Sequence, residues 1–161
     1  MSKGILRIYY GDGYGKSSAA LGTAVSEAGR GRRVMVVSFL REKDISKIQM
    51  LTRFEPEMKF FRFEKSDSSF EMLSQAEQEE ELMNLKNGFN YSKKVITTGG
   101  CNLIVLDEIL ELLEKNIISE DAFLELAQAI PEDMVVICTG RKIGEKIKNC
   151  ADEVYCISTQ K

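Results

Sequence analysis

The chain has 161 residues, of which 43% are hydrophobic and 29% charged, as is typical of one domain with its own core. Its 22 basic and 25 acidic residues give a net charge of −3, which argues against a nucleic-acid-binding surface. The absence of histidine excludes Ser-His and Cys-His nucleophiles, imidazole bases and histidine-ligated metals. Because the sequence shows no signal peptide and no run of ~18 apolar residues, we predict one cytoplasmic domain over residues 1–161, without nucleic-acid or membrane partners.

Short apolar runs alternate with longer amphipathic stretches along the chain. The apolar runs predict strands over residues 5–10, 34–40, 58–63, 103–106, 134–138 and 154–157. The amphipathic stretches predict helices over residues 16–29, 44–54, about 70–95 and 122–129, with Gly29 as C-cap of the first and Ser119 as N-cap of the last. This alternation predicts an α/β fold, with a mainly parallel sheet and helices on both faces.

A glycine-rich turn follows the first predicted strand, and Lys-Ser then opens a helix. The turn and helix start read Gly11-Asp12-Gly13-Tyr14-Gly15-Lys16-Ser17-Ser18. Glycines allow successive backbone N–H groups to point at an anion, and a helix N-terminus adds further donors and a positive dipole end. Lys16 would neutralise phosphate charge and the Ser17 hydroxyl would bind Mg²⁺. The segment therefore predicts a phosphate-binding loop in a nucleoside-triphosphatase-like fold.

The spacing of this loop departs from the usual pattern G-x-x-x-x-G-K-[ST]. Gly11 lies one residue too close to Gly15, and Tyr10 stands where the first glycine is expected. The alternative is a glycine-rich turn that binds no ligand. The preceding strand, the three glycines and the Gly-Lys-Ser sequence together favour phosphate binding.

Two carboxylates end the apolar strand Leu103-Ile104-Val105-Leu106, at the edge where parallel sheets bind ligands. In phosphate-loop proteins such an acid holds magnesium directly or through water. The alternative is that Asp107 and Glu108 cap the following helix. Strand alternation would also direct the two side chains to opposite sides, which argues against identical roles.

The loop, the Asp-Glu pair and the later Thr139-Gly140-Arg141 together resemble the ATP:corrinoid adenosyltransferases of the phosphate-loop class. That family carries T-G-x-G-K-G-K-[ST]-T, A-A-x-G-x-A, G-x-x-V-x-V-x-Q-F, V-V-L-D-E, V-I-I-T-G-R and A-D-x-V in this order. Segments of this sequence match them in order and spacing: 11–18, 19–24, 31–39, 104–108, 135–141 and 151–154. The short loop is a family trait.

The resemblance implies that Mg-ATP binds on the loop and that Co(I) of a reduced corrinoid, cobalamin or cobyrinic acid a,c-diamide, attacks the ribose 5′-carbon and releases triphosphate. It implies catalytic roles for Lys16 and Glu108 and magnesium ligation by Ser17 and Glu108, with Asp107 in a supporting position. It also implies a homodimer and a reductase, such as a flavoprotein, as electron donor. The nucleotide-binding residues would be Gly11, Asp12, Gly13, Tyr14, Gly15, Lys16, Ser17, Ser18 and Arg141.

The sequence departs from the family at several positions. Tyr14 replaces a loop lysine, Ser38 replaces a glutamine, and a corrinoid-side tryptophan has no counterpart; Phe70 stands near its position, after Phe60, Phe61 and Phe63. The phenylalanines could equally be strand core. Two other functions therefore stay open: a phosphate-loop ATPase or kinase, and a nucleotide-binding protein without turnover.

Overall fold

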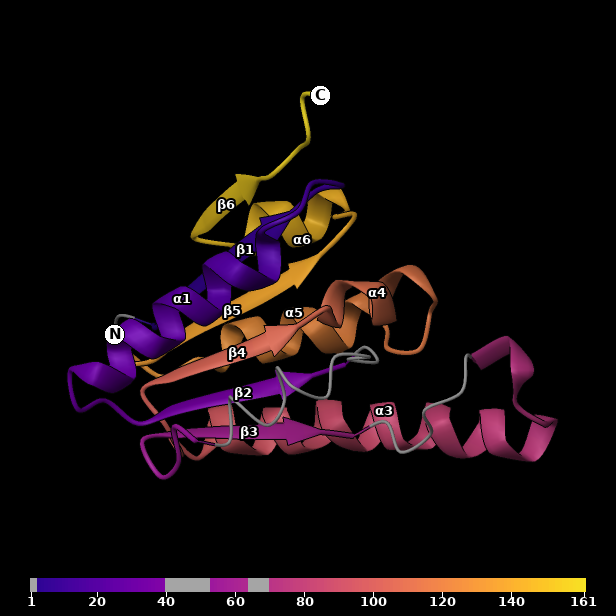
Figure 1. Ribbon diagram of the computed structural model, residues 1–161, viewed down its shortest axis with the longest axis horizontal. Helices are drawn as coiled ribbons and strands as arrows, with labels where there is room; N and C mark the ends of the chain where they lie inside the picture. Colours follow the sequence, from indigo (N-terminus) through magenta and orange to yellow (C-terminus); the bar gives the residue numbers. More distant parts are fainter. Residues whose placement is uncertain (1–2, 40–52, 64–69) are drawn as a thin grey trace.

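A computed structural model of the protein describes residues 3–39, 53–63 and 70–161. Within them the strands form one sheet in which all pairs are parallel, in the order β3-β2-β4-β5-β1-β6 (Figure 1). The strands are β1 (Ile5–Tyr10), β2 (Val34–Ser38), β3 (Met58–Arg62), β4 (Leu103–Asp107), β5 (Val135–Gly140) and β6 (Glu153–Cys156). The helices are α1 (Lys16–Gly29), the short 3₁₀ helix η1 (Phe70–Met72), α3 (Gln75–Thr97), α4 (Ile109–Glu114), α5 (Glu120–Gln128) and α6 (Glu145–Cys150).

All six predicted strands are confirmed, with ends that differ by a residue or two. The first helix has the predicted bounds, and Ser119 caps α5 by accepting from the N–H of Ala122 at 3.0 Å. Gly29 is not the C-cap, because that position belongs to Arg30 and the left-handed residue after it is Gly31, with φ 81°. Of the helix predicted over 44–54, residues 44–52 lie outside the described part of the chain.

Two short helices, α4 and α6, were not predicted. Each has six residues, and its N-cap residue, Glu108 or Gly144, makes no side-chain capping hydrogen bond within the described part of the chain. Helices of this length without a capping side chain carry little start signal in the sequence. The long helix α3 does carry one, because Ser74 and Glu77 form a capping box at its start.

The two faces of the sheet are covered in different ways. On one face α1 packs through Ala20, Ala24 and Ala28, all buried, against a layer that includes Val36 and Val105. The other face lies under α3, α4, α5 and α6 and holds the larger side chains of the core. Small residues let α1 approach the strands closely. The loop before α1 lies at the carboxyl edge of the sheet because it directly follows β1.

The sheet order sets which segments meet at that edge. β5 lies between β4 and β1, and β6 pairs with the free side of β1, so the residues after these four strands gather at one edge. Ligands in open parallel sheets bind at such an edge. In the described part of the chain, no helix is long and apolar enough to cross a membrane.

Candidate active site

The glycine-rich turn connects the end of β1 to the start of α1. Gly15 occupies the N-cap position with φ 107°, a left-handed conformation that strains residues with a Cβ. No side chain of the described residues caps this helix start. The N–H groups of the first turn, which have no partner within the helix, are therefore exposed at the carboxyl edge of the sheet, as an anion site requires.

The turn is held from behind by backbone hydrogen bonds. The N–H of Gly11 is shared between the carbonyls of Gly140 and Arg141, at 3.2 Å each, and the N–H of Gly13 donates to the carbonyl of Ile157 at 3.0 Å. The Lys16 ammonium donates to the carbonyl of Gly13 at 3.1 Å, so it rests on the turn itself. Of the other predicted nucleotide-binding side chains, those of Asp12, Tyr14, Ser18 and Arg141 are exposed.

Asp107 links the turn to the neighbouring strand. Its Oδ1 accepts from the Ser17 hydroxyl at 2.7 Å and from the buried Thr139 hydroxyl at 2.8 Å. The Thr139 oxygen in turn accepts from the N–H of Glu108 at 2.7 Å. Strands β4 and β5 and helix α1 thus meet in one hydrogen-bonded cluster, which we call the Asp107 cluster: Ser17, Asp107, Thr139 and the Glu108 N–H. Neither carboxylate of the pair caps α4 by a hydrogen bond.

Glu108 lies beyond the end of β4, with φ 64°. The strand alternation expected for the pair therefore stops at Asp107, and that argument for opposite sides does not apply to Glu108. Burial raises the pKa of Glu108, and the nearby Asp107 carboxylate raises it further, whereas Lys16 and Arg141 lower it. The charges of Asp107, Lys16 and Arg141 therefore all act on the Glu108 carboxyl group.

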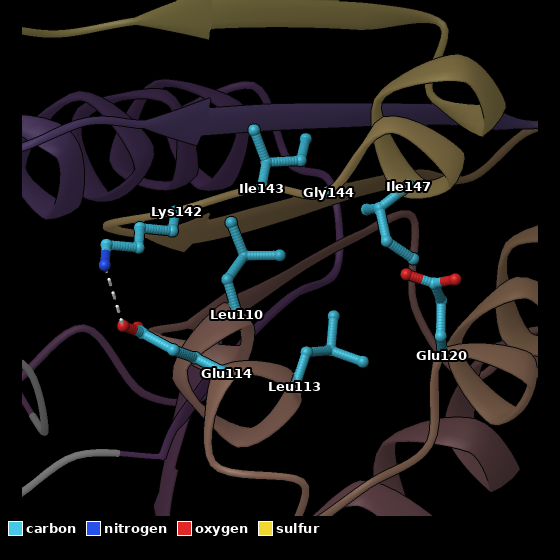
Figure 2. A pocket seen from close by; sticks show the side chains of 8 residues that line it. All are labelled: Leu110, Leu113, Glu114, Glu120, Lys142, Ile143, Gly144 and Ile147. Atoms are coloured by element: carbon cyan, nitrogen blue, oxygen red, sulfur yellow. Dashed lines mark ion pairs between the residues drawn. The ribbon is translucent and has the colours of Figure 1, made fainter.

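Residues of helix α4 line two pockets. Figure 2 shows the first, of about 230 Å³, where apolar side chains face each other beside the Lys142–Glu114 ion pair, 3.7 Å long. The second, of about 270 Å³, is more apolar. It is lined by Phe39, Phe70, Leu82, Leu85, Glu111, Leu112, Lys115 and Ile117. The N–H of Phe39 donates to the carbonyl of Asp107 at 3.0 Å, so one residue that lines the second pocket is bonded through its backbone to the end of β4.

The phenylalanines singled out in the sequence separate into two groups. Phe60 packs in the core under α1, and Phe61 and Phe63 pack against Tyr91 on the other face, with ring centroids 5.3 and 5.7 Å apart. The strand-core alternative is therefore correct for these three. Phe70 differs, because it is partly exposed and lines the second pocket.

Sequence reasoning missed two contributors to the site. Thr139 was noted as part of a motif, but its role as the bridge between Asp107 and the Glu108 N–H depends on strands that are far apart in sequence. Ile157 gave no signal, because its contact with the loop runs through its backbone carbonyl. A backbone contact of this kind places no demand on the side chain at position 157 itself.

The comparisons with solved structures identify the fold. A KaiC-like protein of Pyrococcus horikoshii superposes with a TM-score of 0.65 at 18% identity, covering 98% of this chain and 74% of that one. The flagellar accessory protein FlaH of Methanocaldococcus jannaschii gives a TM-score of 0.61 at 13% identity, covering 97% and 72%. The predicted phosphate-loop α/β fold is confirmed.

The sequence comparisons identify the family. The corrinoid adenosyltransferase of Escherichia coli is 24% identical over 94% of this chain and 75% of that protein, and the Salmonella typhimurium corrinoid adenosyltransferase CobA is 26% identical with the same coverage. The family "ATP:corrinoid adenosyltransferase BtuR/CobO/CobP" matches residues 2–161. The resemblance seen in the motifs thus extends over nearly the whole chain, and the chain belongs to this family of ATP:corrinoid adenosyltransferases.

Proposed function

We propose that the protein transfers the 5′-deoxyadenosyl group of ATP to Co(I) of a reduced corrinoid, either cobalamin or cobyrinic acid a,c-diamide. Co(I) supplies the electron pair of the new cobalt–carbon bond, and the 5′ carbon–oxygen bond breaks with its electrons leaving on triphosphate. The observation that carries this proposal is the phosphate loop joined to Asp107 through Ser17, in a chain of this family.

The loop would hold the polyphosphate through two kinds of group. The N–H groups of residues 14–18, at the end of the loop and in the first turn of α1, would donate to the anion. The N–H groups of Gly11 and Gly13 already donate to backbone carbonyls elsewhere in the chain. The Lys16 ammonium would exchange the Gly13 carbonyl for phosphate oxygens and neutralise charge on the departing triphosphate. We propose a similar charge-stabilising role for Arg141, which follows β5 at the same edge.

The oxygen atoms of Ser17 in the Asp107 cluster and of the neighbouring Glu108 carboxylate fit magnesium, which prefers oxygen ligands and keeps water and phosphate in its coordination shell. No three Cys, Asp or Glu side chains of the described residues converge to hold a metal by themselves, so the phosphates would have to complete the shell. The Ser17 oxygen keeps lone pairs when its hydrogen is donated to Asp107. We propose that Ser17 and Glu108 bind the ion and that Asp107 orients Ser17. Bound magnesium would supply charge neutralisation at the phosphates.

This reaction needs no proton transfer, which suits a protein without histidine. The tasks left to the chain are to align cobalt with the 5′-carbon and to stabilise the leaving group. For the corrinoid we propose the side of the site that holds the second pocket, with Phe70 as an apolar contact beside the macrocycle. Phe70→Ala should then raise the KM for the corrinoid and leave the KM for ATP unchanged.

One observation favours a second candidate, an ATPase. Glu108 lies near Lys16, and a carboxylate whose pKa is raised is a better base toward an attacking water.

The family resemblance also supports a homodimer and a flavoprotein reductase as electron donor. Gel filtration with light scattering would test the first, and a coupled reductase assay the second.

Product analysis distinguishes the candidates. The protein is incubated with Mg-ATP and chemically reduced cobalamin, and the corrinoid spectrum and phosphate products are followed together. Alkylated corrinoid with an equal amount of intact triphosphate supports the transferase. ADP and orthophosphate with an unchanged corrinoid would establish the ATPase instead. ATP binding with neither product would leave a nucleotide-binding protein without turnover.

A further inference from the structure

The phosphate loop is joined to the chain that follows β6 by a continuous run of backbone hydrogen bonds. β6 pairs with β1 up to Tyr10 and Cys156. Beyond the strands, the N–H of Ile157 donates to the carbonyl of Tyr10 at 2.7 Å, and the N–H of Gly13 donates to the carbonyl of Ile157 at 3.0 Å. The pairing between these strands therefore continues into the loop itself.

The same segment explains two of the three loop glycines. A Cβ at Gly11, which is buried with φ 126°, would overlap the carbonyl oxygen of Ile157. A Cβ at Gly13 would lie 2.8 Å from the carbonyl carbon of Ser158 and 2.9 Å from the oxygen of Ile157. At Gly15, in contrast, a Cβ would meet no atom of the described residues within 4 Å. The first two glycines thus admit the backbone of residues 157–158, and the third opens the helix.

Gly13 lies between this segment and the loop lysine. Its N–H bonds to Ile157 and its carbonyl accepts from the Lys16 ammonium at 3.1 Å. Because the Gly11 N–H bonds to the carbonyls of Gly140 and Arg141, the N–H groups of both glycines are engaged by other parts of the chain rather than by an anion. A loop that is fixed before its ligand arrives loses less conformational entropy on binding.

We propose that residues 157–158 are a positioning element for the phosphate loop, with the Ile157 carbonyl as the group that fixes Gly13. The inference rests on the proposed ATP site and deepens it: the segment acts through the loop and touches no substrate. It predicts an effect on ATP binding and little effect once ATP is bound, because the bound polyphosphate itself orders the loop.

The test compares two shortened chains. A chain ending at Cys156 loses the Ile157 contacts, whereas a chain ending at Thr159 keeps them and is the matched control. By calorimetry we expect the first to raise the Kd for Mg-ATP about five- to tenfold, the effect of one lost hydrogen bond, and the second to leave it unchanged. The KM for ATP should rise equally, with kcat at saturating ATP within about twofold of the full chain. An unchanged Kd in the chain ending at Cys156 overturns the proposal.

Gly13→Ala provides an independent arm. In the full chain its Cβ meets residues 157–158 and should raise the Kd about five- to tenfold, while Gly22→Ala, on open helix surface, should not. In the chain ending at Cys156 the same substitution should add less than about twofold, because the atoms it would meet are gone. An equal penalty in both chains overturns the proposal. If the shortened chain does not fold, as judged by circular dichroism, the full chain alone is used, and a Kd that Gly13→Ala leaves unchanged overturns the proposal.

The unmodified chain and Lys16→Ala are measured in the same titrations. If the unmodified chain binds no ATP, the proposed function fails. If it binds ATP and Lys16→Ala does not, while the tail and Gly13 variants bind normally, the positioning role alone is refuted.

Discussion

The candidate site has two sides that are built differently. The loop side, residues 11–18, is continuous in sequence, and its groups act mainly through the backbone. The carboxylate side joins Asp107 to Thr139 and Ser17, which are separated by 32 and 90 residues, through side-chain hydrogen bonds. The groups of the first side come from one segment, which residues 140–141 and 157 support through backbone hydrogen bonds, whereas the groups of the second side are brought together only by the sheet order. Substitutions should therefore weaken binding on the first side and both binding and stability on the second.

The largest loss of affinity should come from the loop side, with Lys16→Ala. Its ammonium rests on a loop carbonyl rather than in a salt bridge among the described residues, so its removal costs little stability. Loss of a charged hydrogen bond to phosphate should weaken Mg-ATP binding on the order of 100-fold. Calorimetry measures this, with Lys86→Ala, at an exposed position of α3, as control. Unchanged binding in Lys16→Ala would refute the loop assignment.

Asp107 tests the other side, where stability and binding should fall together. Asp107→Ala leaves the Ser17 hydroxyl and the buried Thr139 hydroxyl without their acceptor, so the free energy of unfolding should drop by about 2–3 kcal/mol. Asp107→Asn keeps an acceptor oxygen and should recover most of that stability without the charge. Urea unfolding and Mg-ATP titration of both variants separate the two contributions. Equal stability in both variants would show that the hydrogen bonds do not support the fold.

Thr139→Val should have a smaller effect of the same kind. The valine fills a similar volume in the buried position but removes the hydroxyl that donates to Asp107 and accepts from the Glu108 N–H. We expect a loss of about 1–2 kcal/mol in the free energy of unfolding. Thr139→Ser retains the hydroxyl and should lose clearly less. Chemical denaturation of the pair is the measurement, and a serine variant as unstable as the valine would assign the effect to packing instead.

The same contrast explains what the sequence could predict. The loop side and the ends of β1 and α1 were predictable because glycines, Lys-Ser and apolar periodicity are local signals. The strand order was not predictable from the sequence. The contacts of Asp107 with Thr139 and Ser17 depend on that order, so they were not predictable either. Helix α4 was missed because Glu108 enters it in a left-handed conformation without a capping side chain. Because of the same left-handed conformation, strand alternation does not determine the direction of the Glu108 side chain relative to that of Asp107.

The smallest expected effect, and the one of opposite sign, is at Glu108. Because its pKa is raised by burial and by Asp107, the folded protein binds this proton more tightly than the unfolded chain. Stability from this group is therefore complete below the ordinary glutamate pKa and is lost as the pH rises through the raised value. Glu108→Gln avoids that loss, so in metal-free buffer its Tm should exceed the native value by about 1–3 °C at pH 7, with screening keeping the gain small.

The gain in Glu108→Gln should vanish near pH 4, where the native carboxyl is also protonated. Adding Mg-ATP should reverse the order at pH 7, since a cation held by the Glu108 carboxylate compensates for its burial and the glutamine cannot supply that charge. The measurement is a set of melting curves at both pH values, with and without Mg-ATP. The control is Glu111→Gln, because the Glu111 carboxylate also raises the pKa of Glu108. It should raise the Tm at pH 7 only slightly, and Mg-ATP should not reverse that gain. A variant that gains stability at pH 7 and keeps the gain with Mg-ATP would show that the partly buried Glu108 carboxylate destabilises the fold but does not bind magnesium.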